Sequence, residues 1–176
     1  MFLKFAHQIW ENQLPSGGVA IDATCGNGHD AAFLATLDLS HLYVCDIQKE
    51  ALSRTQERLG ENEKILYYLG CHSCFPFVDQ PVDLIVYNLG YLPGGDKSLT
   101  TKTETTLRSV EKGLSLLSLR GLISCMIYPG HSEGSREGEA LLNFTSTLSP
   151  KKFEVSHHQA LNRSRAPSLL LIKKIS

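Results

Sequence analysis

The sequence lacks long apolar runs, and this absence excludes one large class of protein. No stretch of the 176 residues approaches the roughly 20 consecutive apolar residues that a membrane-spanning helix needs. The opening MFLKFAHQIWENQL also lacks a secretory pattern, because polar Glu11, Asn12 and Gln13 follow too soon and no small-residue cleavage site appears. We therefore expect a cytoplasmic protein with no membrane partner.

Excess charge of either sign is also missing. The chain has 17 lysines and arginines against 18 aspartates and glutamates, so its formal net charge is −1. This balance disfavours nucleic-acid binding by bulk charge alone, although it leaves a locally basic face open. Repeats and low-complexity tracts are absent, and 42% of the residues are hydrophobic. We expect one domain over residues 1–176, in which an N-terminal helix (1–14) packs on the rest.

Cysteines are few and odd in number, at positions 25, 45, 71, 74 and 125. Cys71 and Cys74 form a single CxxC with no second pair of ligands at the spacing of a structural zinc site. We therefore expect ordinary free thiols in a reducing compartment, and not a disulfide framework, a metal site or a redox-active cysteine pair. We expect no metal.

What is present is an alternation of short apolar strands with amphipathic helices. The periodicity predicts helices near 2–14, 30–37, 49–59, 101–120 and 136–148, and strands at 19–21, 41–45, 65–69, 83–87, 122–128, 153–159 and 168–173. Thr101 and Glu104 are spaced as a capping box, and Gly121 is expected to end that helix. The pattern indicates an α/β fold with a seven-stranded, mostly parallel sheet covered by helices on both faces. The last two strands should form an antiparallel hairpin.

Ligands of such sheets bind beyond the carboxyl ends of the strands, so the residues there are the candidates for a site. The first strand runs into DATCGNGHD (22–30), where Gly26 and Gly28 allow a tight turn and close approach to a ligand. Ala31 replaces the third glycine of a dinucleotide fingerprint. Asp22 would repel a pyrophosphate and attract a ligand with a positive amine. The alternative is a tight turn that Asp22 merely caps.

Acidic and small polar residues follow the next two strands. Asp46 can accept both ribose hydroxyls of an adenosine, and Ile47 can cover the adenine; alternatively, Asp46 only caps the helix that begins near Gln48. After the third strand, Cys71, His72 and Ser73 can reach the adenine edge by position alone.

The fourth strand runs into NLGYLPGGDK (88–97), where Leu89, Tyr91 and Leu92 are unusually apolar for a plain solvent loop. An ordinary Pro-Gly turn is the alternative. His131, in YPGHSEG after the fifth strand, is a general base, an orienting group or a loop histidine with no task.

Together, DATCGNGHD, Asp46, NLGYLPGGDKS and YPGHSEG resemble a small bacterial family of S-adenosylmethionine-dependent methyltransferases, known as putative rRNA methylases. That family includes the enzyme that methylates 5-aminomethyl-2-thiouridine at the tRNA wobble position. The resemblance covers nearly the whole chain, and NLGYLPGGDK is its specific part. The chain departs from the family's GHPGG stretch at Gly130–Gly134, where the proline is missing.

The resemblance implies a Rossmann-like class I methyltransferase with S-adenosylmethionine as cofactor. The residues that it places against the methionine moiety are Asp22, Thr24, Gly26, Asn27, Gly28 and Asp30. Those that it places against the ribose and adenine are Asp46, Ile47, Gln48, Cys71, His72 and Ser73. Those that it places near the methyl group are Asn88, Leu89 and Gly90. Asn88, Tyr91 and His131 are the catalytic candidates. The expected reaction is N-methylation of the aminomethyl group, with the anticodon region of tRNA as partner.

Carbon methylation is disfavoured because residues 88–96 contain no cysteine nucleophile. The candidates for contact with RNA are Tyr91, Asp96, Lys97, Arg163 and Arg165. The N-terminal helix, with Phe2, Phe5 and Trp10, either supplies a homodimer interface or packs over the donor site. The alternatives are methylation of rRNA, methylation of a small molecule, and a non-catalytic nucleotide-binding module.

Overall fold

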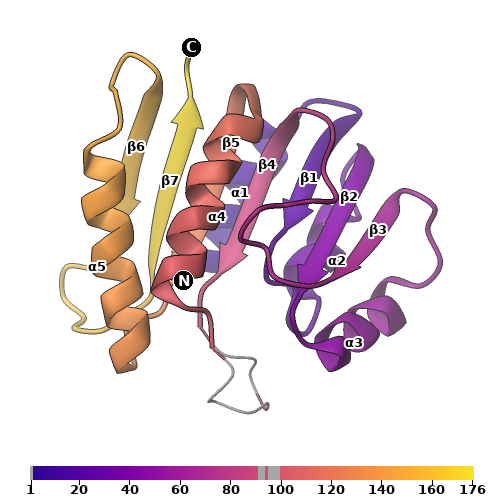
Figure 1. Ribbon diagram of the computed structural model, residues 1–176, viewed down its shortest axis with the longest axis horizontal. Coiled ribbons are helices and arrows are strands. Elements are labelled where there is room, and N and C mark those ends of the chain that lie inside the picture. The colour runs from indigo at the N-terminus through magenta and orange to yellow at the C-terminus, as the bar shows by residue number, and fades with distance from the viewer. Residues whose placement is uncertain (1, 91–93, 95–99) are drawn as a thin grey trace.

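The strands form one sheet whose order is β3-β2-β1-β4-β5-β7-β6 (Figure 1). The structure is a computed structural model that describes residues 2–90, 94 and 100–176. The strands are β1 (Gly18–Asp22), β2 (Leu39–Asp46), β3 (Ile65–Leu69), β4 (Val82–Asn88), β5 (Leu117–Ile127), β6 (Phe153–His158) and β7 (Ser168–Lys174).

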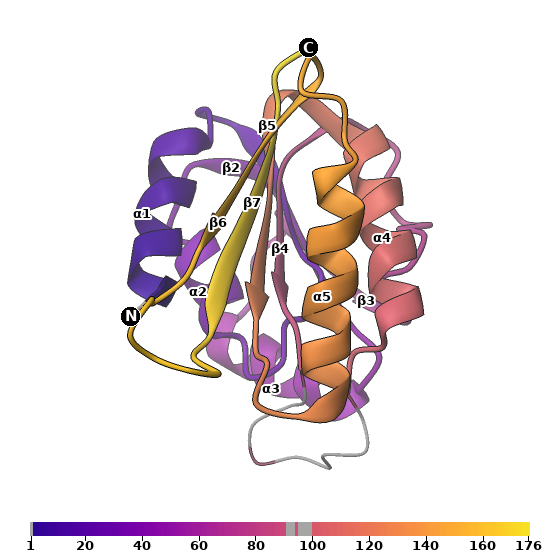
Figure 2. The ribbon, with the colours of Figure 1, turned by 90° about the vertical axis from the view of Figure 1, so that its left-hand side faces the viewer.

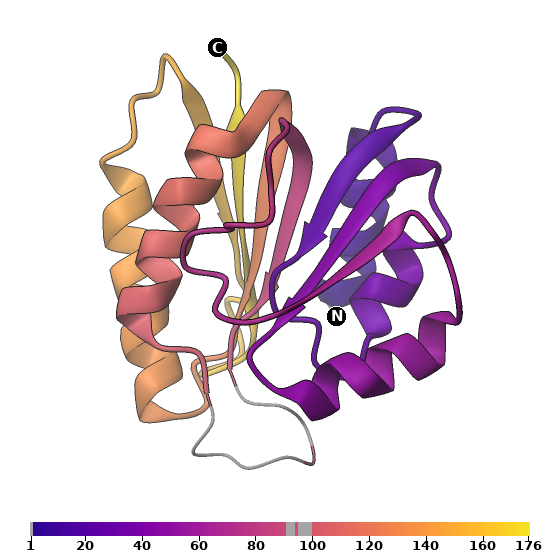
Figure 3. The ribbon, with the colours of Figure 1, turned by 45° about the vertical axis from the view of Figure 1, so that its right-hand side comes forward.

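The first five strands are parallel, and β7 pairs antiparallel with both β5 and β6. This arrangement confirms the predicted mostly parallel sheet with a C-terminal antiparallel hairpin. β1 pairs with β2 on one side and β4 on the other, so the strand order reverses there. Crevices at such reversals are where open α/β sheets bind ligands. Figure 3 shows the carboxyl ends of these strands at the edge where α3 (Lys49–Leu59) lies.

Helices cover both faces of the sheet (Figure 2). One face packs against α1 (Phe2–Gln13), α2 (His29–Leu34) and α3, and the other against α4 (Thr103–Leu116) and α5 (Ser132–Ser146). Successive residues of β4 divide between the two cores: Leu84 and Val86 face α1, while Ile85 and Tyr87 face α4. Burial on both faces explains why the parallel strands read as continuous apolar runs.

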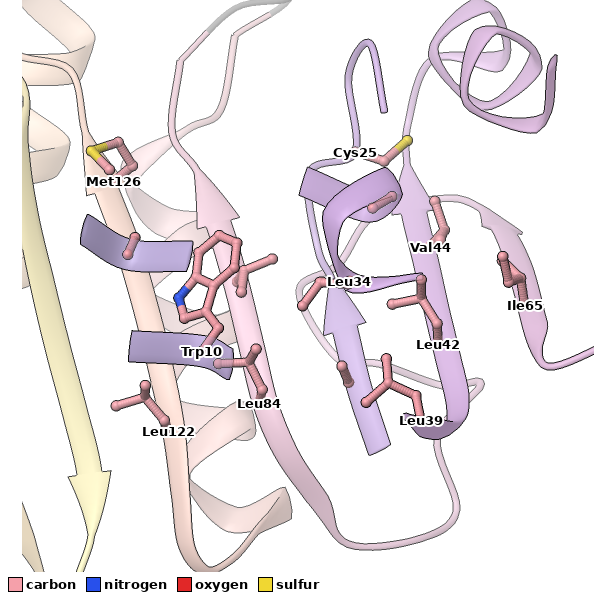
Figure 4. Close-up of a cluster of buried hydrophobic side chains, with 14 of the residues drawn as sticks. Trp10, Cys25, Leu34, Leu39, Leu42, Val44, Ile65, Leu84, Leu122 and Met126 are labelled. Atoms are coloured by element: carbon pink, nitrogen blue, oxygen red, sulfur yellow. The ribbon is translucent and has the colours of Figure 1, made fainter. Parts of the chain in front are cut away.

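The N-terminal helix packs on the sheet through Trp10, whose side chain is 3% exposed and lies over Leu84, Leu122 and Met126 (Figure 4). Trp10 is therefore buried within the chain, against the sheet. No helix among the described residues is long and apolar enough to cross a membrane.

Two boundary predictions around α4 are wrong. Thr101 is not an N-cap: α4 begins at Thr103, and the Thr101 hydroxyl donates to Glu137 at 2.8 Å. Gly121 lies inside β5, which begins directly after α4. A Cβ at Gly121 would come within 2.9 Å of the Val82 carbonyl oxygen, so the glycine permits a close strand approach.

Two further helices differ from prediction in length. α5 begins at Ser132, four residues earlier than predicted, because His131 is its N-cap. α2 ends at Leu34, three residues early.

Candidate active site

A cavity of about 530 Å³ opens at the carboxyl edge of the sheet, next to the reversal between β1 and β4. That volume falls within the range of small-molecule sites. Its walls come from the glycine loop, the ends of β2, β4 and β5, helix α1 and the β6–β7 loop. The lining residues are Leu3, Thr24, Cys25, Gly26, Asn27, His29, Asp30, Asp46, Gln48, Asn88, Leu89, Gly90, Tyr128, Gly130, His131, Arg165 and Pro167.

Most of the predicted site residues meet in this cavity. Those that line it are Thr24, Gly26, Asn27, Asp30, Asp46, Gln48, Asn88, Leu89, Gly90, His131 and Arg165. Others lie outside its walls: Asp22, Gly28, Ile47, Cys71, His72, Ser73 and Arg163. The predictions for Tyr91, Asp96 and Lys97 lie outside the described residues.

The glycine loop is held by Asp46. Its Oδ2 accepts from the backbone N–H of Gly26 at 3.0 Å, and its Oδ1 accepts from that of Gln48 at 2.9 Å. Gly26 and Gly28 have φ values of 52° and 75°, a region that favours glycine. A Cβ at Gly28 would also come within 2.8 Å of the Thr55 hydroxyl oxygen. Each Asp46 oxygen keeps lone-pair capacity for a ligand hydroxyl.

Carboxylates give this end of the cavity a negative potential. Asp22 is 1% exposed, and its Oδ1 accepts from the backbone N–H of Thr24 at 3.2 Å. Burial raises the pKa of Asp22 well above its usual range, and the charges of Asp30 and Asp46 add to the rise. Asp30 and Asp46 line the cavity, and their charges disfavour a bound phosphate and favour a cationic ligand.

Asn88 sits at the centre of the opposite wall, at the end of β4. Its backbone N–H donates to the Thr24 hydroxyl at 2.7 Å, and its side-chain Nδ2 donates to Asp30. The Tyr128 hydroxyl donates to Asn88 Oδ1 at 3.3 Å. Burial and the nearby Asp30 raise the pKa of Tyr128, so its hydroxyl stays a donor at neutral pH. The second Asp30 oxygen lies 2.7 Å from His7 Nε2.

His131 has a defined hydrogen-bonding state. As the N-cap of α5, it accepts from the backbone N–H of Gly134 at its Nδ1, at 3.1 Å. A neutral ring with this acceptor carries its proton at Nε2. This geometry favours an orienting role for His131 over that of a general base.

His72, which follows β3, lies outside the cavity walls. His72 is 6% exposed, its ring meets Tyr87 edge-on at 5.7 Å between centroids, and its carbonyl accepts from Ser109. Burial lowers the pKa of His72 to about 4. The side chain belongs to the core under α4.

Sequence reasoning missed six lining residues: Leu3, Cys25, His29, Tyr128, Gly130 and Pro167. All but Leu3 adjoin predicted motifs. Cys25 is 5% exposed, and burial together with the Asp22 carboxyl raises its pKa, so it is a neutral thiol. The described residues contain no group of three His, Cys, Asp or Glu side chains that could hold a metal.

Residues 42–174 match the family model described as "Putative rRNA methylase". The chain belongs to this methyltransferase family. It is 35% identical to the chloroplastic tRNA (mnm(5)s(2)U34)-methyltransferase of Arabidopsis thaliana over 187 residues, which cover 97% of this chain and 68% of the relative.

Solved structures agree with that assignment. A "putative rRNA-methylase" of Clostridium thermocellum is 34% identical, with a TM-score of 0.94 and coverage of 98% of this chain and 97% of the other. A "putative methyltransferase" of Streptococcus mutans, solved in complex with S-adenosylhomocysteine (SAH), is 32% identical, with a TM-score of 0.91 and coverage of 99% and 98%. SAH is the product that S-adenosylmethionine leaves after it gives up its methyl group. Together with the family, its presence in this similar structure identifies the chain as an S-adenosylmethionine-dependent methyltransferase.

Proposed function

We propose that this enzyme transfers a methyl group from S-adenosylmethionine to the amine of 5-aminomethyl-2-thiouridine at the wobble position of tRNA. The observation that carries the proposal is the 35% identity, across 97% of this chain, to a relative named as a tRNA (mnm(5)s(2)U34)-methyltransferase. Membership in a methyltransferase family also favours an enzyme over a non-catalytic nucleotide-binding module.

The donor fits the cavity by charge and by hydrogen bonding. In this proposal Asp46 and Gln48 hold the ribose and adenine side, while Thr24, Gly26, Asn27 and Asp30 face the methionine moiety. The Asp30 and Asp46 carboxylates in the cavity wall favour a ligand that carries an ammonium and a sulfonium. When bound, the donor supplies a methyl group already activated by its positive sulfur, so the protein mainly positions the reactants.

The acceptor amine must be neutral before it can attack. An alkylamine resembles lysine, with a pKa of ~10.4 in water, and both desolvation and a neighbouring cation lower that value. Asn88 lines the cavity, and its Oδ1, which accepts from the Tyr128 hydroxyl, has a second lone pair that can take one N–H of the amine. Carbon methylation instead needs a thiolate, and the cavity-lining Cys25 is a neutral, buried thiol.

RNA contacts are expected at the mouth of the cavity, from the loop between β6 and β7. Arg165 lines the cavity, and Arg163 is two residues away on the same exposed loop. Lys151 and Lys152 precede β6 and lie at the opposite edge of the sheet, because β6 runs parallel to β5. This basic area is small, but it is sufficient for an RNA that inserts one extruded base into the cavity and makes only a few phosphate contacts.

The test incubates the wild-type enzyme and tritiated S-adenosylmethionine with total tRNA from a strain that lacks the enzyme. Two parallel incubations replace the tRNA with a metabolite extract or with rRNA from the same strain. Label in tRNA supports the proposal. Label confined to the metabolite extract or to rRNA would replace it with one of the two alternatives.

A further inference from the structure

Asp30 connects two parts of the chain that are far apart in sequence. It is 4% exposed, and each of its oxygens has one partner: His7 Nε2 on α1, at 2.7 Å, and Asn88 Nδ2 at the end of β4. A carboxylate only accepts hydrogen bonds, so both partners present N–H groups to it. One buried side chain thus ties the N-terminal helix to the cavity wall.

The His7 ring is fixed by its neighbours. It stacks on Phe33 with 4.0 Å between centroids and 9° between planes, and it lies 4.9 Å from the Trp10 ring. His7 is not among the residues that line the cavity. Its hydrogen-bonded link to the cavity wall runs through Asp30.

Asp30 determines how the Asn88 side-chain amide is oriented in the cavity wall. The carboxylate takes the Nδ2 group, so Oδ1 points the other way, where the Tyr128 hydroxyl donates to it. An oxygen there accepts an N–H from an incoming amine and leaves the nitrogen lone pair directed at the methyl group. The reversed amide would offer its NH2 to that same lone pair and hold it away from the donor.

We propose that His7 is a positioning residue for methyl transfer: its hydrogen bond holds the Asp30 carboxylate in place, and Asp30 keeps Asn88 Oδ1 turned toward the acceptor amine. The expected effect on the rate of methyl transfer rests on the proposed function, because that function supplies the acceptor amine. The proposed effect of His7 on the orientation of Asn88 does not depend on the proposed function. Without His7, the buried Asp30 carboxyl loses one of its two partners. The carboxylate is then free to turn, and the Asn88 amide that it holds turns with it.

The first experiment needs no substrate. The Asn88 side-chain amide is assigned in a ¹H–¹⁵N spectrum of the SAH-bound protein by its loss in Asn88→Asp. His7→Phe, which keeps a stacking ring but no donor, should shift this resonance, and His7→Gln, which restores a donor, should return it toward the wild-type position. An unmoved Asn88 resonance in His7→Phe would overturn the proposal.

The second experiment measures turnover on tRNA that carries the aminomethyl group. His7→Phe should lower kcat by about 10- to 100-fold, because a small misplacement of a reacting group has effects of this size. His7→Gln should recover most of the rate, and Gln8→Ala, on the exposed side of α1, should match wild type. Equal losses in both His7 variants would mean a packing defect and reject the proposal.

The two failures are distinguishable. A wild-type enzyme that leaves this tRNA unmethylated would refute the proposed function, and the spectrum of His7→Phe would still decide the role of His7.

Discussion

Asp46 holds the glycine loop and faces the cavity at the same time. Asp46→Ala removes the acceptor of the Gly26 and Gln48 N–H groups together with the proposed ribose contact. We expect the Kd for S-adenosylmethionine to rise by about 10- to 100-fold, since hydrogen bonds to charged groups contribute about 1.5–3 kcal/mol. Isothermal titration calorimetry measures this change.

Arg165→Ala is the matched comparison for Asp46→Ala, because both residues line the same cavity. It should leave the donor Kd near its wild-type value and lower turnover on tRNA. The opposite pattern, with donor binding lost in Arg165→Ala and kept in Asp46→Ala, would show that the donor and substrate sides are assigned the wrong way round.

The buried His72 should make the free energy of unfolding sensitive to acid. Its folded pKa, about 4, lies below the ordinary 6.5, so the unfolded chain binds the proton more tightly and stability falls as pH drops through this interval. For one such group the free energy of unfolding should fall by about 2 kcal/mol between pH 7 and pH 5. Urea unfolding of wild type and His72→Phe at both values measures it. An equal pH dependence in the two proteins would contradict the shift.

The residues at the donor end were predictable because their signals are local. Asp46 ends β2 and Gly26 lies in the loop after β1, and parallel strands end at one edge of the sheet. Leu3 and His7 were not predictable as site residues, because they reach the site only through the way α1 crosses the sheet. His72 was misplaced for a related reason: its position after a strand was right, but its side chain turns into the core.

At the scale of elements, α1 is the clearest case of tertiary packing. Trp10 is 3% exposed over β4 and β5, so Trp10→Ala should lower the free energy of unfolding by about 3–5 kcal/mol. Lys4→Ala, at an exposed position of the same helix, should change it by less than about 0.5 kcal/mol. Urea denaturation compares the two; a loss below 1 kcal/mol for Trp10→Ala would mean that α1 packs only loosely.

Strand and helix positions were predicted well where burial is periodic, as in α3 and β3, whose observed bounds match the prediction. The boundary between α4 and β5 was not, because Gly121 suggests a helix end while its role is a close approach between strands. Thr101 was read as a local cap. Its actual partners are Gly90 on one side and Glu137 on the other, which no local pattern shows.

At the scale of the molecule, near-neutral charge limits how the enzyme can hold RNA. The basic residues that flank β6 do not form one patch, since Lys151 and Lys152 lie at the edge opposite Arg163 and Arg165. With about two or three phosphate contacts, log Kd for an anticodon stem-loop should rise with log salt with a slope of only about 2. A slope several times larger, measured by fluorescence anisotropy, would indicate a more extensive interface. The homodimer and the cytoplasmic location stay predictions.

The central claim is that the methyl group goes to the amine of the modified wobble uridine. The most direct test incubates the enzyme and S-adenosylmethionine with two anticodon stem-loops that differ only in carrying 5-aminomethyl-2-thiouridine or 2-thiouridine, followed by nucleoside mass spectrometry. We expect one added methyl on the aminomethyl nucleoside and none on the stem-loop without the amine. Methylation of both stem-loops, or of neither, would contradict the claim.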